Sequence, residues 1–375
     1  MRLALIAPTY LPARRANTVQ VMKMAQAITA LGHDVLVLVP GKDANISWEQ
    51  LAHHYGLTLR FEITWITAKA SMRSYDFGWL AVRRAKSWHA DVIYSRLPQA
   101  AAVASFLGIP TILETHDFPG GLLGPWLFTR FLKGRGARCL VVITKALRDT
   151  LRETGLLSAK SLPVVIAPDG VDLARYKNLP SQEDTRRNLN IPDRFTVGYT
   201  GHLYAGRGIA QILKMAAQLP AMNFLLAGGN AADIERVDEQ IKFDQLDNVM
   251  LLGFIPNAEL PLYQAACDVL LMPYQKQVAA SSGGDIAHYF SPMKLFEYLA
   301  CGRAILSSDL PVLLEVLNPT NALLLPSDDI EAWVEALLLL HENPKQRDKL
   351  AAQAHHDAQQ YSWQARAQKI LESLI

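Results

Sequence analysis

The chain has 375 residues, half of them hydrophobic, so two domains with well-packed cores are expected rather than one. Three scattered cysteines do not indicate a disulfide framework, no Cys and His cluster has metal-ligand spacing, and no apolar run of about 18 residues could span a membrane. The net charge is +2, but residues 1–170 carry 20 basic and 11 acidic side chains, whereas residues 171–375 carry 17 and 24. The basic first half is therefore expected to meet an anionic partner or surface.

The N-terminal half alternates short β-rich runs with helical patterns. Its expected strands are apolar throughout, as strands covered on both faces should be, and lie at 3–8, 34–39, 91–96, 110–115, 139–144 and 163–167. A helix is expected near 18–31, where Val21, Met24 and Ile28 share one stripe and Gly32 ends it. Strand, helix and strand in repetition indicate a parallel sheet wrapped by helices.

The same pattern restarts after a polar stretch at 178–192. Further strands are expected at 195–200, 223–227, 248–252, 269–272, 304–307 and 322–325, and helices near 207–218, 232–243, 258–266, 292–300, 311–317 and 328–341. The fold class is therefore α/β, with two doubly wound Rossmann-like domains at 1–175 and 190–361 joined by a hinge. Ligands of such sheets bind beyond the carboxyl ends of the strands, so a cleft between two facing domains is the expected site.

The segment 291–302 has the signals of a helix whose start binds phosphate. Ser291 is a favoured N-cap, Pro292 suits the first helical position, and Gly302 favours an end. The free backbone N–H groups at such a start bind anions, here those of Met293, Lys294 and Leu295.

Two charged side chains in this segment extend the prediction. Lys294 adds a full positive charge to the helix dipole, and Glu297 lies three residues later on the same face. A ligand that presents a phosphate next to two neighbouring hydroxyl groups is a nucleotide, whose ribose carries the hydroxyls. The alternative is a capped helix whose Lys294 and Glu297 pair in solvent.

Other candidates also follow strands. His116, in the loop 114–121, can donate to a substrate hydroxyl or move a proton, or else be a structural histidine. The glycine-rich loop 198–208 carries Arg207, a fork for phosphate oxygens, although a plain tight turn is the alternative. The loop 253–256 could hold a planar base through exposed backbone and Phe254, unless that ring belongs to the core. The polar loop 279–285 has the composition of a lid.

Residues 122–138 interleave aromatic and basic side chains. This pattern indicates a membrane-surface or acceptor-binding element. Pro125 and Gly134 interrupt it, and an ordinary solvated helix is the alternative.

An ordered set of motifs resembles one family over nearly the full length. It comprises residues 32–35, 115–116, 167–172, 199–201, 291–297 and 361–363. The chain is similar to retaining nucleotide-sugar glycosyltransferases of family 4 (glycosyltransferase group 1), which have the GT-B fold of two Rossmann-like domains. The resemblance implies that a final helix at about 362–375 crosses back to the first domain.

The resemblance also assigns roles. Glu297 matches the glutamate that holds the donor ribose, Arg207 a phosphate-binding lysine, and His116 a histidine that contacts the transferred sugar. With these and Lys294 as the catalytic set, the implied donor-binding residues are Gly201, His202, Gly253, Phe254, Ile255, Tyr289, Ser291, Pro292, Met293 and Leu295. The implied acceptor-binding residues are Arg14, Arg15, Asn17 and Thr18.

Three departures from the family pattern are present. Tyr289 stands where the family has the first glutamate of a pair whose second member is Glu297, and Lys294 or Asp285 is expected to compensate. His202 stands where a phosphate-binding arginine is common. The glycine pair of the first loop is absent from the region 14–18, so acceptor choice is expected to differ.

The implied activity is metal-independent transfer of a sugar from a nucleotide diphosphate-sugar, needing no cofactor, with the anomeric configuration retained. The acceptor is expected to be a glycan or a lipid-linked molecule, and no nucleic-acid partner is expected. The cysteine pattern indicates a cytoplasmic protein, and the basic N-terminal domain suggests peripheral contact with the inner face of the membrane. The alternatives are a nucleotide-sugar 2-epimerase and a non-catalytic nucleotide-binding homologue.

Overall fold

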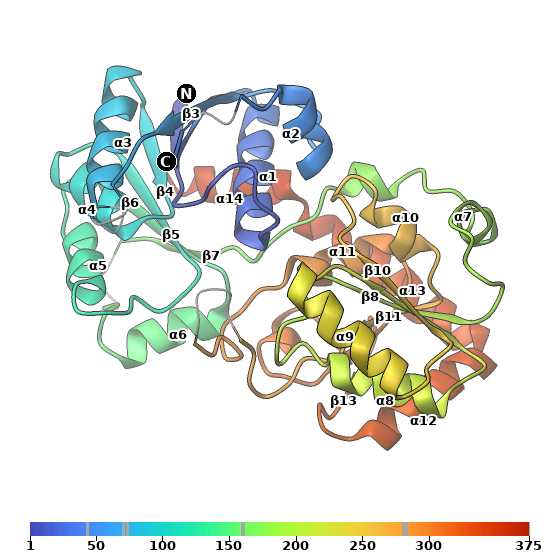
Figure 1. Cartoon of the computed structure of the whole chain (residues 1–375). Coiled ribbons are helices and arrows are strands. Elements are labelled where there is room, and N and C mark those ends of the chain that lie inside the picture. Colours follow the sequence, from blue (N-terminus) through green and yellow to red (C-terminus); the bar gives the residue numbers. More distant parts are fainter. Residues whose placement is uncertain (43–44, 70–71, 73–74, 159–161, 280–283, 375) are drawn as a thin grey trace. The chain divides into compact units, whose positions relative to one another are not determined.

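The computed structural model describes residues 1–42, 45–69, 72, 75–158, 162–279 and 284–374 (Figure 1). The chain divides into unit 1, residues 1–169 with the segment from Trp363 onwards, and unit 2, residues 170–362. Each unit is a parallel sheet covered by helices, so the predicted fold class of two doubly wound Rossmann-like domains is confirmed. None of the described helices is long and apolar enough to cross a membrane.

Unit 1 contains a seven-stranded parallel sheet in the order β3-β2-β1-β4-β5-β6-β7. Its strands are β1 (Arg2–Ile6), β2 (Asp34–Pro40), β3 (Glu62–Ile66), β4 (Val92–Ser95), β5 (Thr111–Thr115), β6 (Ala137–Val142) and β7 (Val164–Ile166). Its helices are α1 (Ala16–Ala30), α2 (Trp48–Tyr55), α3 (Tyr75–Ser87), α4 (Pro98–Phe106), α5 (Gly124–Leu132), α6 (Lys145–Glu153) and α14 (Trp363–Glu372). The last helix, α14, packs against the first, α1.

Unit 2 contains a six-stranded parallel sheet in the order β10-β9-β8-β11-β12-β13. Its strands are β8 (Thr196–Thr200), β9 (Asn223–Ala227), β10 (Val249–Gly253), β11 (Val269–Met272), β12 (Ala304–Ser308) and β13 (Leu323–Leu325). Its α-helices are α7 (Gln182–Asn188), α8 (Ile209–Gln218), α9 (Ala231–Phe243), α10 (Leu260–Ala265), α11 (Met293–Cys301), α12 (Ile330–Glu342) and α13 (Pro344–Ala358). Short 3-10 helices lie at Leu173–Tyr176, Leu313–Glu315 and Gln359–Tyr361.

The central strands are apolar because both faces of each sheet are buried. Along β11, Val269 and Leu271 belong to one hydrophobic cluster, while Leu270 and Met272 belong to the cluster on the other face. Successive side chains of a strand point to opposite faces, so a continuous apolar run is needed to fill both clusters.

One expected helix differs from the structure, and one observed strand was not expected. The helix predicted at 311–317 is reduced to the 3-10 turn at Leu313–Glu315. The strand β3 was not predicted. It is an edge strand that pairs only with β2 among the described strands, and its residues after Glu62 are half-buried. Because a half-buried strand can contain both polar and apolar side chains, β3 lacks the continuous apolar run by which the other strands were predicted. Residues 280–283, the centre of the predicted lid, lie outside the described residues.

Candidate active site

The helix α11 begins one residue later than expected. Pro292 is the N-cap with extended backbone (φ −83°, ψ 123°), so the prediction of Ser291 at this position is wrong. The N–H of Leu295 donates to the Pro292 carbonyl at 3.0 Å, whereas the N–H groups of Met293 and Lys294 have no intrahelical acceptor in this first turn. Gly302 is the C-cap in the left-handed region (φ 63°), as the sequence indicated. In the described part of the chain, two of the three expected backbone donors therefore have no acceptor and can donate to an anion.

Lys294 is buried in unit 2, and its ammonium has no hydrogen-bond partner among the described residues. Its Nζ lies 3.5 Å from the ring centre of Tyr199 and 5.6 Å from that of Tyr274. Burial, reinforced by the charge of Arg207, holds the pKa of Lys294 well below its usual value. A buried cation without an acceptor is costly, so this arrangement is suited to a negatively charged ligand.

Gly201 makes room for that ammonium. Its φ of +131° is unfavourable for any other residue, and a Cβ at this position would lie 2.8 Å from the Nζ of Lys294. The glycine-rich loop therefore lies close to the Lys294 side chain at the start of α11.

Arg207 provides a second cation beside Lys294. Its guanidinium carbon lies 5.2 Å from the ring centre of Tyr274, the same ring that Lys294 faces. One amino group donates to the carbonyl of Ala279 at 3.4 Å, while the buried Nε has no partner among the described residues. Two partly unsatisfied cations around one tyrosine form a local positive field that diphosphate oxygens can neutralise.

Glu297 lies one helical turn beyond Met293 and is held by a buried polar network. The side-chain amide of Gln264 donates to its Oε2 at 3.3 Å and to the Thr200 hydroxyl at 3.1 Å, and accepts from the Tyr176 hydroxyl at 2.7 Å. The carboxylate keeps further capacity to accept hydrogen bonds from hydroxyl groups. Gln264 and Tyr176 were not predicted as site residues, because their roles depend on the packing of α10 and the 3-10 helix at Leu173–Tyr176 against α11.

The remaining donor-site residues of unit 2 lie in loops. The His202 ring stacks on the Tyr204 ring, with 4.7 Å between the ring centres and 3° between the ring planes. The backbone carbonyl of His202 accepts a hydrogen bond from the Tyr199 hydroxyl at 2.6 Å. Gly253 has φ 69°, and its carbonyl accepts from Gly228 at 2.6 Å. Phe254, Tyr289 and Ser291 are half-buried, and Ile255 packs against a small apolar cluster.

Asp285 does not offer a free carboxylate in place of the one that Tyr289 lacks. Its Oδ1 accepts from the backbone N–H groups of Val278 and Ala287 at 2.8 and 2.9 Å, and these bonds lower its pKa. Of the two residues expected to compensate, Lys294 is therefore the one whose polar group lacks a partner among the described residues.

His116 lies in unit 1, directly after β5, and its Nε2 bonds the buried carboxylate of Glu114. Burial and the neighbouring Arg96 lower the pKa of His116 to about 4 against the opposing effect of Glu114. The imidazole is therefore neutral at pH 7. Because its Nε2–H donates to Glu114, Nδ1 is left as an acceptor for a substrate hydroxyl.

Glu114 is itself fixed by residues that sequence reasoning missed. Arg366 of α14 donates to its Oε2 at 3.2 Å, and Gln20 donates to its Oε1 at 2.7 Å, while the Tyr94 hydroxyl donates to Oε2. Although burial opposes ionisation, Arg366 and His116 lower the pKa of Glu114 to about 2. The C-terminal helix thus fixes the carboxylate that orients His116.

The expected acceptor residues stand around the start of α1. Arg14, Arg15 and Asn17 are exposed, and Arg15 is the N-cap of α1. Thr18 is fully buried and bonds the Thr9 hydroxyl, so its side chain supports the loop from within.

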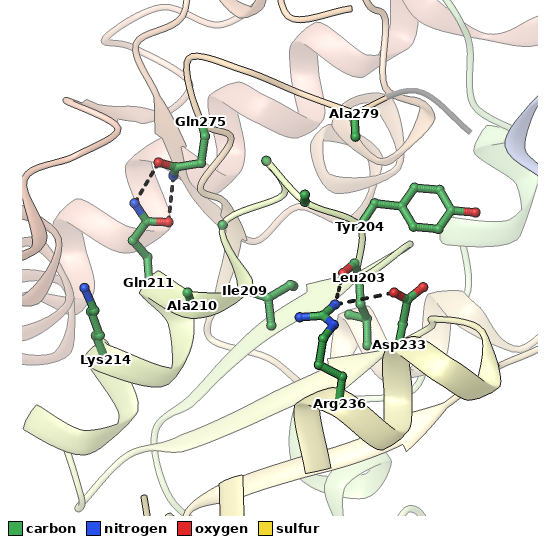
Figure 2. A pocket seen from close by; sticks show the side chains of 13 residues that line it. Leu203, Tyr204, Ile209, Ala210, Gln211, Lys214, Asp233, Arg236, Gln275 and Ala279 are labelled. Carbon is green, nitrogen blue, oxygen red and sulfur yellow. Dashed lines mark hydrogen bonds and ion pairs between the residues drawn. The ribbon is translucent and has the colours of Figure 1, made fainter. Parts of the chain in front are cut away.

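A surface hollow of about 810 Å³ lies beside the glycine-rich loop (Figure 2). Gln211 and Gln275 exchange side-chain hydrogen bonds of 2.8 and 2.7 Å at one end, and Arg236 donates to the Leu203 carbonyl at 2.9 Å. Arg207, Lys294 and Glu297 are not among its lining residues. The hollow and the two cations therefore border the same glycine-rich loop.

Unit 2 is a Rossmann-like domain with two cations at the carboxyl ends of its parallel strands, an arrangement suited to binding an anion. Comparisons with known proteins identify the class of protein. Residues 181–357 match the family described as glycosyl transferases group 1, and residues 18–175 match Glycosyltransferase Family 4. The chain is a glycosyltransferase with the GT-B fold.

Individual relatives are distant. A phosphatidyl-myo-inositol mannosyltransferase from Mycolicibacterium smegmatis is 23% identical over 99% of this chain and 92% of its own length. A D-inositol 3-phosphate glycosyltransferase from Rhodococcus erythropolis is 28% identical over 56% of this chain and 47% of its own length, so the match covers about half of that protein. The solved structure of Anabaena HepE in complex with UDP has a TM-score of 0.77 at 19% identity and covers 100% of this chain and 99% of that one.

Proposed function

We propose that this glycosyltransferase moves a sugar from a nucleotide diphosphate-sugar to an acceptor hydroxyl, without a metal and with retention of the anomeric configuration. The observation that carries the proposal is the buried ammonium of Lys294 at the start of α11, which lies beside Arg207 and has no hydrogen-bond partner in the described part of the chain. A similar fold was solved with UDP bound in HepE, which supports a nucleoside diphosphate as the leaving group.

Different residues of unit 2 bind different parts of the donor. Lys294, Arg207 and the first N–H groups of α11 neutralise the charge that grows on the departing diphosphate. Glu297 accepts hydrogen bonds from the ribose hydroxyls. Because Gln264 holds this carboxylate before the donor arrives, little reorganisation is needed on binding.

The transfer itself needs no protein nucleophile. The acceptor oxygen bonds to the anomeric carbon on the face that the diphosphate leaves, and the proton of the acceptor hydroxyl passes to a diphosphate oxygen. His116 of unit 1, neutral and held by Glu114, can accept a hydrogen bond from a substrate hydroxyl at its Nδ1. For the acceptor, the names of the inositol-glycosylating relatives support a glycolipid or another glycoconjugate.

The test incubates the protein with a panel of UDP-, GDP- and ADP-sugars, with and without acceptor extract and with and without EDTA. We expect release of free nucleoside diphosphate only with acceptor, unaffected by EDTA, and a product whose anomeric configuration by NMR matches the donor. Donor turnover without acceptor would indicate the epimerase, and binding without turnover the non-catalytic homologue.

Two variants link the activity to the site. Glu297→Ala and Arg207→Ala are each expected to lower the transfer rate about 100-fold or more. Glu342→Ala, an exposed glutamate at the end of α12, is the matched control and should transfer normally. Wild-type turnover by Glu297→Ala would contradict the proposed donor site.

A further inference from the structure

The hollow of about 810 Å³ in unit 2 lies where three neighbouring strands end (Figure 2). It is bounded by the loops after β8 and β11 and by the first two turns of α8 and α9, the helices that follow β8 and β9. Ligands of parallel α/β sheets bind beyond the carboxyl ends of the strands, and pockets of about 300–1,000 Å³ hold small organic molecules. Both the position and the size of the hollow therefore fit a ligand site.

One end of the hollow carries a carboxylate that can accept a further hydrogen bond. In Figure 2, Asp233 and Arg236 lie together at this end, where Nη2 of Arg236 donates to the Oδ1 of Asp233 at 3.4 Å. The Oδ2 of Asp233 is shielded from solvent and has no hydrogen-bond partner in the described part of the chain. Because χ2 of aspartate is a broad torsion, a small rotation turns this oxygen toward the hollow. A ligand that donates hydrogen bonds is therefore favoured.

The other end carries two amide oxygens in fixed positions. Nε2 of Gln211 donates to the Oε1 of Gln275 at 2.8 Å and to the Ser327 carbonyl at 2.9 Å. Nε2 of Gln275 donates to the Oε1 of Gln211 at 2.7 Å and to the Pro273 carbonyl at 2.9 Å. An amide oxygen has two lone pairs, so each of the two can also accept from a ligand. Lys214, which is exposed, adds donors at this end.

An aromatic ring completes the lining. The half-buried ring of Tyr204 is stacked on the His202 ring, with 4.7 Å between the ring centres and 3° between the ring planes. This stacking covers one face of the Tyr204 ring and fixes its orientation, while Tyr204 itself lines the hollow. A pyranose presents an apolar face of C–H groups, which packs well on an aromatic ring.

The polar groups of the hollow indicate the class of its ligand. Asp233 and the two glutamines accept hydrogen bonds, whereas Lys214 and Arg236 donate them. A hydroxyl group both donates and accepts, so a ligand with many hydroxyls can use both kinds of group. The carboxylate of Asp233 offsets the charge of Arg236 and repels an anion, which favours a neutral ligand over a diphosphate.

We propose that the hollow binds a neutral oligosaccharide. The Tyr204 ring packs against the apolar face of one sugar, and Asp233 with Arg236 exchanges hydrogen bonds with its hydroxyl groups. The ligand is an intact glycan rather than an activated donor, so the inference goes beyond sugar transfer. Only the interpretation of this glycan as part of the acceptor, held at units other than the one that receives the sugar, rests on the proposed function.

The test is saturation-transfer NMR and calorimetry of the full chain with linear trisaccharides of glucose, mannose and galactose, each α-linked and β-linked. We expect at least one trisaccharide to bind with a dissociation constant of about 1 mM or lower. Excess UDP should not displace it, because Lys294 and Arg207 do not line the hollow. The measurement needs no turnover, so its failure is distinguishable from a failure of the proposed transfer.

Two variants assign the binding to the hollow. Ala210→Trp places a large side chain at an exposed position that lines the hollow and should abolish binding, whereas Ala217→Trp, exposed on the same helix outside the lining, is its control. Asp233→Asn should weaken binding about tenfold or more, since a hydrogen bond to a charged group is lost. Its control is Glu239→Gln, an exposed site on α9 outside the lining.

The outcomes separate as follows. Weaker binding in Ala210→Trp and Asp233→Asn, with normal binding in both controls and unchanged melting temperature and UDP affinity, supports the proposal. A wild type that binds none of the trisaccharides overturns it, and so does a trisaccharide that UDP displaces. Binding by Ala210→Trp at the wild-type affinity also overturns it, because the blocked hollow could not then be the site.

Discussion

Replacing Lys294 by Met should make the protein more stable and less able to bind its donor. Methionine keeps the apolar stem but removes the ammonium that is buried without a hydrogen-bond partner among the described residues. The wild type gains about 1–2 kcal/mol from the cation–π contact with Tyr199, but burying an unpaired ammonium costs several kcal/mol. The free energy of unfolding should therefore rise by about 1–3 kcal/mol at pH 7, measured by urea denaturation.

The pH dependence gives the same prediction a second readout. The pKa of Lys294 in the folded protein lies well below its usual value, so near and above this folded pKa the unfolded chain binds more protons than the native one. Wild-type stability should then rise as the pH climbs from that lowered pKa toward about 10.4, the ordinary lysine value. Lys294→Met lacks this rise, so its advantage narrows with increasing pH.

Binding supplies the third readout. Loss of one charge-assisted hydrogen bond to the diphosphate should weaken UDP or GDP binding about 10- to 100-fold in calorimetry. Lys349→Met, an exposed site on α13, should change stability by less than about 0.5 kcal/mol and leave binding intact. A Lys294→Met protein that is several kcal/mol less stable yet binds nucleoside diphosphate normally would refute the reasoning.

Three further predictions follow from the contacts. Gly201→Ala should destabilise unit 2 by about 1–3 kcal/mol and weaken nucleotide binding, because its Cβ would meet Lys294; unchanged binding would contradict that contact. Arg366→Met should cost about 3–5 kcal/mol at pH 7, since it leaves the Glu114 carboxylate buried with too few partners. The ionised Glu114 stabilises the wild type above the unfolded pKa of about 4.3, and this contribution is lost toward pH 2, so the wild-type advantage over Arg366→Met should shrink on acidification. NMR titration of His116 should show no protonation between pH 6 and 8, with a midpoint near 4. A midpoint near 6.5 would contradict the burial of the ring and its position beside Arg96.

The sequence was sufficient for the fold where burial on two faces imposed a continuous apolar run. The strand predicted at 269–272 is β11 to the residue, because Val269 to Met272 must fill clusters on both sides. The edge strand β3 lacked that requirement and was missed.

Local signals also located the start of α11, although the cap was misassigned by one residue. Pro292 is compatible with both an N-cap and a first helical position, so the sequence could not decide between them. The position of the Lys294 ammonium against the Tyr199 ring was not predictable, since it depends on Tyr199 and Gly201 from a distant strand and loop.

The supporting network of His116 lay beyond any local pattern. Glu114 bonds Gln20, 94 positions away, and Arg366, 252 positions away. Only the parallel sheet and the packing of α14 on α1 bring these residues together. Long-range polar contacts of this kind are set by tertiary structure, so the sequence showed the histidine but not what orients it.

The most direct test of the donor site is a crystal structure of the protein with a nucleoside diphosphate. We predict diphosphate oxygens within hydrogen-bonding distance of the Lys294 ammonium and the Arg207 guanidinium, with the ribose hydroxyls on Glu297. A diphosphate bound instead in the hollow between Gln211 and Arg236, with Lys294 still unpartnered, would contradict the account.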